Sequence, residues 1–356
     1  MLVTGATGNL GQSICTGLEG DYTVVGLDRD RAPNERRVIE MDITSEISIR
    51  EALAAIRRDL GSRIAAIVHL IAYFDFSGEP DALYNEVNEK GISDLLGVLE
   101  DFEVGRFIYA STMLVHRPGV PGERINEQTP LDPRWVYPRS KARAEAAIRS
   151  NATMPYAILR LAGVYDEQTA VPTLSHQIAR IYSRDLQSHL YAGPLDAGQA
   201  MLHREDLIDA VRRTIARRLT LPTEVTMLIG EPETLGYDTI QEMLGRLIHG
   251  EHEWQTLKIP VPVAKLGSKI QNLSEPLIPD VIDGGDKPFI QPYMIDMADD
   301  HYELDISLAR NLLDWEPQHR LGEELPGIVE NLKADPVAWH EMNGVAFSRN
   351  RQAGKR

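Results

Sequence analysis

A glycine-rich turn near the N-terminus narrows the choice of folds more than any other segment. The apolar run Met1–Thr4 leads into Gly5-Ala6-Thr7-Gly8-Asn9-Leu10-Gly11, in which the glycines are spaced three apart. The first glycine permits a tight turn, the second lets the backbone approach a pyrophosphate, and the third lets the next helix pack on the strand. The turn therefore predicts a dinucleotide cradle at a helix N-terminus. We assign to it Gly5, Thr7, Gly8, Gly11 and the backbone amides of Asn9 and Leu10.

The second apolar run, Thr23–Leu27, ends at an acidic residue, Asp28. A carboxylate at this place accepts hydrogen bonds from the adenosine ribose and repels a 2′-phosphate, which favours NAD. Arg29 leaves NADP as the alternative, because a guanidinium pairs well with a 2′-phosphate. Asp42 and Ile43 follow the next short strand and are assigned to the same site. Asp42 either accepts from the adenine amino group or belongs to the N-cap region of the next helix.

Strand and helix patterns alternate through the first half of the chain. This alternation is typical of a parallel sheet with helices on both faces, where continuous apolar strands are covered on both sides. We therefore predict an α/β Rossmann fold, a doubly wound parallel sheet, with a smaller C-terminal substrate domain. The predicted strands are Met1–Thr4, Thr23–Leu27, Ile64–Leu70, Phe107–Ala110 and Ala157–Leu159, and the predicted helices are Ile49–Leu60, Leu83–Leu99 and Ser140–Ile148.

The second half of the chain has a different character. Helical patterns cover Pro172–Arg184, Arg204–Arg218 and Thr239–Ile248, and Val225–Ile229 is a further strand. Proline is frequent in residues 258–292, which predicts a loop-rich wall or lid. We expect an NAD-binding domain over 1–165 to which 200–235 returns, a substrate-binding domain over 166–199 and 236–335, and a tail over 336–356 with a disordered end.

Charge and cysteine content restrict the partners. The 356 residues carry a formal net charge of −16, which argues against nucleic acid or an anionic membrane as the main partner. The single cysteine, Cys15, excludes an internal disulfide and a thiolate metal cluster. No apolar run reaches the roughly 18–20 residues that span a bilayer, and the first residues form a strand rather than a signal peptide. We expect a cytoplasmic protein that binds a small molecule and no metal.

The segment Tyr137-Pro138-Arg139-Ser140-Lys141 places a phenol and an ammonium on one helix face, one turn apart. Free tyrosine has a pKa near ~10, too high for a base at neutral pH, and a neighbouring cation favours the phenolate. The strand before it ends in two hydroxyl residues, Ser111 and Thr112, at the sheet edge where ligands bind. One of these hydroxyls is suited to hold a substrate oxygen. The combination predicts hydride and proton transfer at a C–OH/C=O centre.

Together these motifs resemble the extended short-chain dehydrogenases/reductases, the group that contains the nucleotide-sugar epimerases and dehydratases. The resemblance spans about residues 1–330. The further motif residues are His69-Leu70-Ile71-Ala72, Asn88, Ser140-Lys141-Ala142 with Glu145, Leu159-Arg160, Val164-Tyr165, His203, Asp206-Leu207, Asp305-Ile306-Ser307, Ala309-Arg310 and Leu313-Asp314-Trp315-Glu316-Pro317.

The resemblance implies roles for individual residues. Thr112, which stands 25 residues before Tyr137, aligns with the catalytic Ser/Thr, and Ser111 is the alternative. Tyr137 is then the acid/base, and Lys141 lowers the pKa of Tyr137 and binds the nicotinamide ribose. Two residues are assigned to the nicotinamide-side wall, Leu70 and Ala72.

Two departures from the family pattern limit the reaction. The 4,6-dehydratases follow their threonine with Asp-Glu, whereas Thr112 is followed by Met113-Leu114, which leaves the elimination step without an obvious catalyst. Many nucleotide-sugar enzymes have an asparagine where Gly163 stands, to hold the diphosphate. Gly163 therefore weakens the prediction of a nucleotide-sugar substrate.

Several polar and aromatic residues have two interpretations each. Tyr73, Phe74 and Phe76 follow the fourth strand and either line the substrate pocket or pack in the core or a lid. His203 either contacts substrate or makes a structural hydrogen bond. Asn88 is interpreted as a structural hydrogen-bonding residue of its helix.

We predict an NAD-dependent oxidoreductase or epimerase that acts on a secondary alcohol or ketone of a sugar or sugar derivative. A hydroxysteroid-type or other ketone reductase is the alternative that Gly163 permits, and a non-catalytic NAD-sensing regulator is the third hypothesis. Members of the family often pair through two helices per subunit, here Leu83–Leu99 and Ser140–Ser150. The resemblance therefore implies a homodimer.

Overall fold

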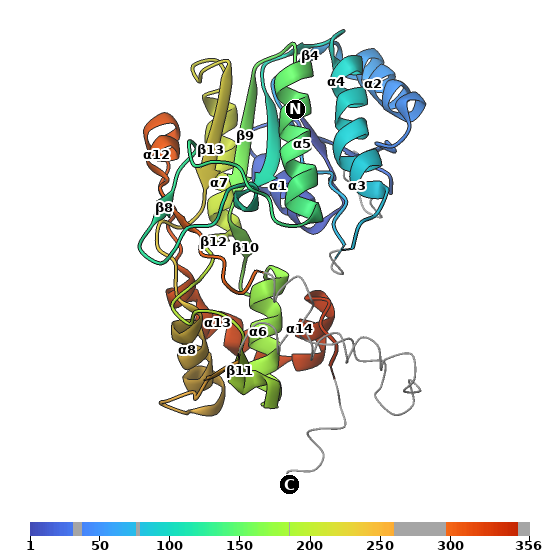
Figure 1. Cartoon of the computed structure of the whole chain (residues 1–356). Coiled ribbons are helices and arrows are strands. Elements are labelled where there is room, and N and C mark those ends of the chain that lie inside the picture. Colours follow the sequence, from blue (N-terminus) through green and yellow to red (C-terminus); the bar gives the residue numbers. More distant parts are fainter. Residues whose placement is uncertain (31–37, 76–78, 185, 260–296, 348–356) are drawn as a thin grey trace.

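A seven-stranded parallel sheet forms the centre of the molecule (Figure 1). The computed structural model describes residues 1–30, 38–75, 79–184, 186–259 and 297–347. The strands are β1 (Leu2–Thr4), β2 (Val25–Asp28), β3 (Val38–Glu40), β5 (Ile67–His69), β7 (Phe107–Thr112), β9 (Tyr156–Leu161) and β13 (Glu224–Ile229). They lie in the order β13-β9-β7-β5-β1-β2-β3, and every neighbouring pair is parallel. The predicted α/β class and Rossmann architecture are confirmed.

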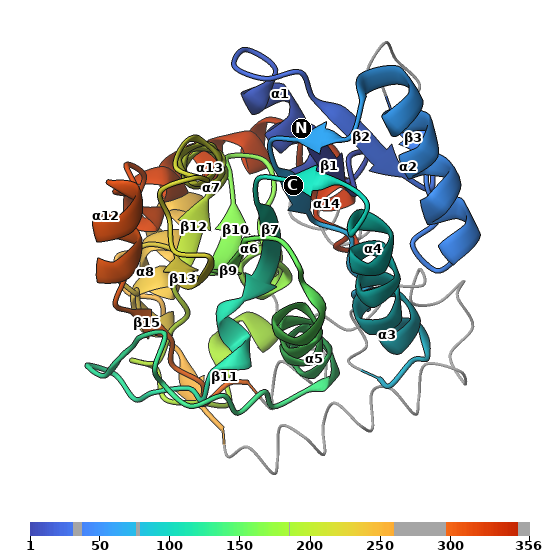
Figure 2. The same ribbon diagram turned by 90° about the horizontal axis from the view of Figure 1, so that it is seen from above.

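Helices cover both faces of this sheet, as the view from above in Figure 2 shows. Each face closes its own apolar core, with Trp315 buried in the first and Ile148 in the second. Two covered faces explain why the strands are continuous apolar runs. The first face carries α1 (Asn9–Leu18), α7 (Arg204–Ala216) and α12 (Ser307–Leu313); the second carries α2 (Glu46–Leu60), α4 (Gly91–Leu99) and α5 (Val136–Asn151).

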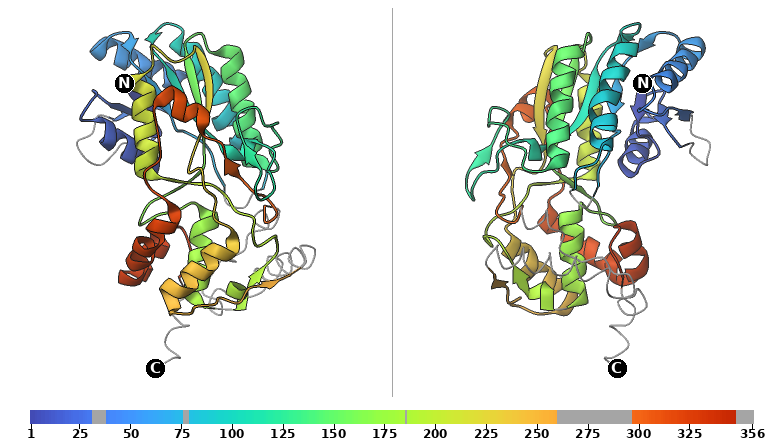
Figure 3. Two further views of the ribbon diagram at one scale, coloured as in Figure 1. Left: turned by 90° about the vertical axis from the view of Figure 1, so that its left-hand side faces the viewer. Right: turned by 45° about the vertical axis from the view of Figure 1, so that its right-hand side comes forward.

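A smaller helical unit lies beside the carboxyl edge of the sheet (Figures 1 and 3). It has a third apolar core, which includes Tyr165 and Trp254. Its helices are α6 (Pro172–Ser183), α8 (Tyr237–His249), α13 (Leu321–Ala334) and α14 (Pro336–Met342). Short parallel pairs complete the chain: β10 (Gly163–Tyr165) with β12 (Met201–His203), β11 (Leu190–Tyr191) with β14 (Leu257–Lys258), β8 (Arg124–Ile125) with β15 (Glu303–Leu304), and β4 (Arg63–Ile64) with β6 (Glu103–Val104).

The chain passes between the central sheet and the smaller helical unit at more places than the predicted domain ranges include. β13 forms an edge of the central sheet, and α12 packs on it, although residues 303–315 fall within the range expected for the substrate domain. Residues 336–345, expected to belong to a tail, contain α14 and place Trp339 and Val345 in the third core. Buried apolar side chains account for both differences. The tail end 348–356 and most of the proline-rich segment 258–292 lie outside the described residues.

Local signals set the ends of several helices. α2 begins after Ser45, whose hydroxyl accepts a hydrogen bond from the Ser48 amide. α6 begins at Pro172, whose fixed φ suits the first turn of a helix. α8 ends at Gly250, which has a left-handed φ of 73°. None of the helices in the described part of the chain combines the length and hydropathy that a membrane span needs.

Candidate active site

A cavity of about 670 Å³ lies at the carboxyl edge of the central sheet. Its walls come from the turn after β1, the loop after β5, the end of β7 and the start of α5. Ligands of doubly wound sheets bind at this edge, where connections diverge to opposite faces. Among the sequence-predicted residues, the cavity brings together Gly5, Gly8, Asn9, Leu10, Gly11, Leu70, Ala72, Ser111, Thr112, Tyr137 and Lys141. Thr7, Asp28, Arg29, Asp42, Ile43, Tyr73 and His203 do not line it.

The glycine turn fits a pyrophosphate for a steric reason. Gly5 has a φ of 72°, in the left-handed region that favours glycine. A Cβ on Gly11 would lie 1.9 Å from the Gly5 carbonyl oxygen, so no other residue fits where α1 meets the turn. Gly8 precedes α1, and the first-turn amides of that helix follow at Asn9 and Leu10.

Asp28 stands at the end of β2, and its carboxylate also holds the glycine turn. The Thr7 amide and hydroxyl donate to Asp28 Oδ2 at 2.9 and 2.8 Å. The Arg29 amide donates to Oδ1 at 2.8 Å. The carboxylate is thereby fixed beside the turn, in the place expected to receive the adenosine ribose. Thr7 contributes by orienting Asp28, and the Arg29 residue is exposed.

Asp42 folds back on the start of the following loop. Its Oδ1 accepts from the amide and the hydroxyl of Thr44 at 2.9 and 2.7 Å, and these bonds lower the pKa of the Asp42 carboxyl. Ser45, not Asp42, is the N-cap of α2. Ile43 is buried in the second core and approaches Gly91. These contacts give both residues a structural role, and any contact of Asp42 with adenine stays a prediction.

Tyr137 and Lys141 lie one turn apart on α5, and both line the cavity. Lys141 Nζ donates to the carbonyl oxygen of Ala110 at 2.7 Å. It also lies 4.7 Å from the ring centre of Tyr109 and 5.8 Å from that of Tyr137. The end of β7 and the ring of Tyr109 therefore hold the amine beside the phenol.

Burial dominates the titration of this pair. It lowers the pKa of the Lys141 amine to about 7 and raises the pKa of the Tyr137 phenol above its ordinary value. Glu145 acts on Lys141 in the opposite direction, as a smaller effect. The expected lowering of the Tyr137 pKa by Lys141 is therefore outweighed by desolvation in the protein alone. Tyr137 carries its proton at neutral pH, and Lys141 is partly protonated.

The two hydroxyls at the end of β7 have different surroundings. Ser111 Oγ donates to Glu145 Oε1 at 2.6 Å, within a buried network in which Glu145 pairs with Arg160 at 2.7 Å. Arg160 also bonds His116 Nε2 at 2.8 Å. Thr112 Oγ1 makes a longer contact of 3.3 Å, with the Leu114 amide. Ser111 is thus engaged in the core network, and Thr112 is the better placed of the two to meet a ligand.

Asn88 lies in a π-helical turn, Glu86–Lys90, which links α3 (Leu83–Asn85) to α4. Its side chain connects the loop after β5 to α5. Asn88 Oδ1 accepts from the Tyr73 amide at 2.6 Å, and Nδ2 donates to the Ser140 hydroxyl at 2.8 Å. Ser140 in turn donates to the Tyr137 carbonyl at 2.8 Å. Single π-helical turns are frequent at functional sites. Here the turn directs one buried amide at two segments of the site.

Aromatic side chains surround Tyr137. Phe74 and Trp135 line the cavity, and the Phe74 ring meets that of Tyr137 edge-on at 4.9 Å. Tyr73 points elsewhere, because its hydroxyl donates to Asp81 at 3.0 Å and its ring packs on Tyr84. Phe76 lies outside the described residues.

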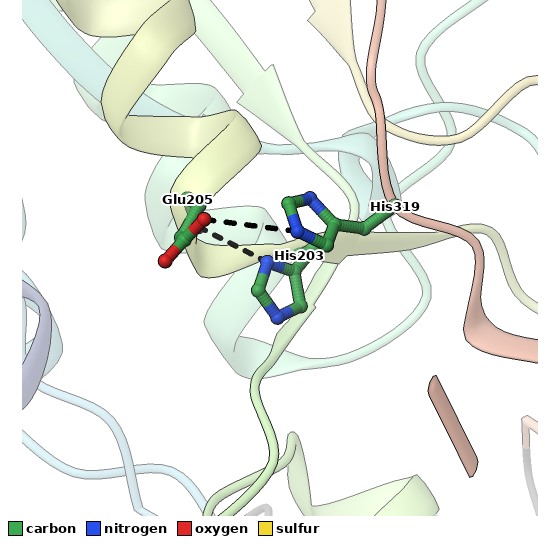
Figure 4. A group of neighbouring side chains, drawn as sticks. All are labelled: His203, Glu205 and His319. Carbon is green, nitrogen blue, oxygen red and sulfur yellow. Dashed lines mark hydrogen bonds and ion pairs between the residues drawn. The ribbon is translucent and has the colours of Figure 1, made fainter. Parts of the chain in front are cut away.

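His203 lies at the junction of β12 and α7, stacked on His319 with ring centres 3.9 Å apart (Figure 4). Its Nδ1 accepts from the Glu205 amide at 3.3 Å, and Nε2 lies 3.6 Å from Glu167. One ligand atom each of His203, Glu205 and His319 lies within 4.8 Å of the others. The structure already gives one nitrogen of each ring a partner: His203 Nδ1 accepts from the Glu205 amide, and His319 Nδ1 lies 3.2 Å from Asp206 Oδ2. The cluster is best described as a polar joint in which His203 is buried and Glu205 is exposed.

Several cavity residues escaped the sequence analysis. Some adjoin a motif without belonging to it, and others come from distant segments that only tertiary folding brings to the cavity. The clearest are Met113, Leu114, Trp135, Thr173, Gln199 and Met297.

A family model described as the NAD dependent epimerase/dehydratase family matches residues 1–230, which include the glycine turn, Thr112, Tyr137 and Lys141. The chain belongs to this family. The N-acetyl-alpha-D-glucosaminyl-diphospho-ditrans,octacis-undecaprenol 4-epimerase of Escherichia coli O157:H7 is 25% identical over 150 residues. That match covers 42% of this chain and 42% of that protein.

Solved structures share the fold along nearly the whole chain. The UDP-glucuronic acid 4-epimerase of Bacillus cereus, in complex with UDP-glucuronic acid and NAD, is 20% identical with a TM-score of 0.67, over 94% of this chain and 98% of that one. The NAD complex of the UDP-glucose 4-epimerase of Thermus thermophilus is 20% identical with a TM-score of 0.66, over 94% and 99%. At these identities the likeness establishes the fold alone. Family membership confirms the predicted resemblance, the enzyme class and NAD as the family's cofactor.

Proposed function

We propose that this protein transfers a hydride between NAD and a secondary alcohol or ketone of a sugar or sugar derivative, with Tyr137 as the acid/base. One observation carries the proposal: Thr112, Tyr137 and Lys141 line the same cavity as the glycine turn. A phenol, an amine and a hydroxyl around a dinucleotide cradle are the groups that proton-coupled hydride transfer needs.

The residues present fit a dinucleotide. The Asn9 and Leu10 amides would hold the pyrophosphate, and Asp28 would hold the adenosine ribose. Asp28 favours NAD over NADP, and the exposed Arg29 offers a 2′-phosphate no preformed pocket in the described residues. Leu70 and Ala72 would lie along the nicotinamide. When bound, NAD supplies the hydride acceptor, and its reduced form the donor.

Tyr137 delivers or removes the proton of the substrate oxygen. Because burial raises its pKa, the phenol is protonated at neutral pH and ready to donate to a carbonyl oxygen. In the oxidative direction the phenolate must form. The Lys141 amine beside it, with a pKa of about 7, stabilises the phenolate when protonated. Thr112 holds the substrate oxygen and shares its developing charge.

The substrate is a sugar derivative by analogy with the relatives, whose names specify sugars linked to diphosphates. A hydroxysteroid-type or other ketone reductase is the second candidate, because Gly163 stands where many nucleotide-sugar enzymes have asparagine. The non-catalytic regulator has less support, since Thr112, Tyr137 and Lys141 all face one cavity. A cytoplasmic location and the two-domain division are part of the same proposal.

The test is to incubate the protein with NAD and with NADH and a panel of sugar nucleotides, free uronates and steroid alcohols and ketones. Epimerisation would exchange stereochemistry without net NADH, whereas a dehydrogenase or reductase would change the NADH absorbance stoichiometrically. Protein that binds NAD yet neither interconverts nor oxidises or reduces any compound of the panel would contradict the proposal.

A further inference from the structure

The substrate side of the cavity is built from hydrocarbon. Beyond Tyr137 its walls are aliphatic and aromatic, among them Phe74, Leu114, Trp135, Val164, Val171 and Met297. Two neutral polar side chains join them, Thr173 and Gln199, and the Thr173 hydroxyl lies 3.5 Å from Gln199 Oε1. Such a wall gains free energy by covering apolar surface and offers few partners to a polyhydroxylated ligand.

The described residues of the cavity wall also offer no free charge for a phosphate. Of the described residues that line it, Lys141 alone is charged, and its amine is engaged by the Ala110 carbonyl beside Tyr137. The nearby Arg204 does not line the cavity, and its guanidinium pairs with Asp166 at 2.8 Å and donates to Thr169. Diphosphates are held by guanidinium or ammonium groups or by helix N-termini. The α1 N-terminus serves the cofactor. The start of α6 also lines the cavity, but Pro172 has no N–H, and the Leu174 and Ser175 amides already donate to the Val171 carbonyl oxygen at 2.9 Å each.

Apolar side chains crowd the position of Gly163. A Cβ there would meet Met201 Sδ at 2.8 Å and Val171 Cγ2 at 3.0 Å. A side chain at this position would therefore require the Met201 thioether or the Val171 isopropyl group to move. Where many nucleotide-sugar enzymes have an asparagine that holds the diphosphate, this protein therefore has apolar packing.

We infer that the substrate is an uncharged, largely apolar ketone or secondary alcohol, without a nucleoside diphosphate. This inference rests on the hydride transfer of the proposed function and, for the substrate, favours its second candidate, a ketone reductase or dehydrogenase, over a sugar derivative. The carbonyl or hydroxyl carbon lies near Thr112 and Tyr137, and the hydrocarbon body lies against the wall formed by Phe74, Leu114, Trp135 and Val171. Burying a phosphate beside these groups would leave its charge unpaired, at a large cost.

The test is calorimetric titration of the NAD-loaded full chain with two probes: 2-decalone, an uncharged bicyclic ketone, and UDP. The inference predicts that 2-decalone binds more tightly than UDP by roughly tenfold or more. UDP binding as tightly as 2-decalone, or a failure of 2-decalone to bind, would overturn it. A protein that prefers UDP and still transfers hydride to a sugar nucleotide would refute this inference and leave the proposed function intact.

A charge placed on the apolar wall gives a second test. Val171 is the N-cap residue of α6 and makes no capping bond through its side chain, so Val171→Asp supplies a favourable cap. The melting temperature and NAD affinity report whether this variant folds. We expect its affinity for 2-decalone to fall by roughly tenfold, whereas Leu219→Asp adds the same charge at an exposed side chain beyond α7 and leaves that affinity unchanged. Equal affinities in Val171→Asp and the unaltered protein would refute the apolar site.

Discussion

Residues that are neighbours in the sequence have different surroundings at this site, which indicates a structural role for one and a role in the proposed chemistry for the other. Ser111 and Thr112 are adjacent, yet Ser111 donates to the buried Glu145, whereas Thr112 accepts from the nearby Leu114 amide. The sequence alone did not decide between the two hydroxyls. Successive side chains of β7 point to opposite faces, but the pattern does not show which of the two is hydrogen-bonded within the core. Tyr137 and Lys141 were predictable, since their spacing within one helix fixes their geometry.

Replacing the two hydroxyls one at a time should separate these roles. Thr112→Ala should lower kcat by about 10²–10³ and leave NAD affinity unchanged, because it removes a donor to the developing oxyanion. Ser111→Ala should instead lower the free energy of unfolding by about 1–3 kcal/mol, since a buried bond to Glu145 is lost. Steady-state kinetics and urea unfolding measure the two effects. Equal effects of both variants on kcat would contradict the assignment.

Helices and strands were predicted well where a regular apolar pattern was present. The strands of the central sheet and the helices near 49–60, 83–99, 172–184 and 239–248 appear in the structure within a few residues. α13 was not predicted, because Pro326 and two glycines interrupt its pattern, and tertiary packing of Leu325 and Ile328 sustains it. The π-helical turn at Glu86–Lys90 also leaves no mark in the apolar pattern.

The π-helical turn should stabilise the site through Asn88. Asn88→Ala removes bonds to Tyr73 and Ser140 and should lower the free energy of unfolding by about 2–3 kcal/mol. The matched variant Lys90→Ala removes an exposed ion pair with Asp94 and should lower the free energy of unfolding far less. Urea unfolding of the two variants decides the matter, and equal losses would show that Asn88 is not a special support.

At the scale of the molecule, the cavity lies between a sheet that the sequence predicts and a helical unit that it predicts only in part. The glycine turn, where we propose that the cofactor binds, forms one part of the cavity wall. The opposite wall is assembled from Gln199, Met297 and the start of α6, which are far apart in the chain. Substrate choice therefore depends on long-range packing, and this is why the sequence could indicate the reaction but not the substrate.

Glu231 joins the two units and should give the protein a pH-dependent stability. Its carboxylate is buried at the end of β13 and accepts from the Tyr165 hydroxyl and the Leu321 amide, each at 2.9 Å. Burial raises its pKa from 4.5 to about 7. Because the pKa of Glu231 is higher in the folded than in the unfolded state, its protonation contributes to the free energy of unfolding. This contribution is fully present below pH 4.5 and is lost as the pH rises through about 7.

Glu231→Gln should remove this dependence. Between pH 5 and pH 8, the unaltered protein should lose on the order of 1–3 kcal/mol of unfolding free energy relative to the variant. Urea unfolding of both proteins at the two pH values is the measurement. The same pH response in both would show that Glu231 does not titrate in this window.

The family resemblance implies a homodimer, and α4 and α5 are in contact with each other on one face of the sheet, where they could form half of a four-helix bundle. We expect twice the chain mass at micromolar concentration in light scattering. A monomeric mass under those conditions would contradict the prediction.

The rate of hydride transfer in Tyr137→Phe tests the central claim most directly. With the substrate found in the panel, rapid-mixing measurement of NADH formation or consumption should show a fall of about 10²–10⁴, while NAD affinity and melting temperature stay unchanged. Tyr22→Phe, which removes a phenol at a partly buried position after α1, should transfer hydride at the original rate. Transfer by Tyr137→Phe at the rate of the unaltered protein would show that this phenol does not carry the proton.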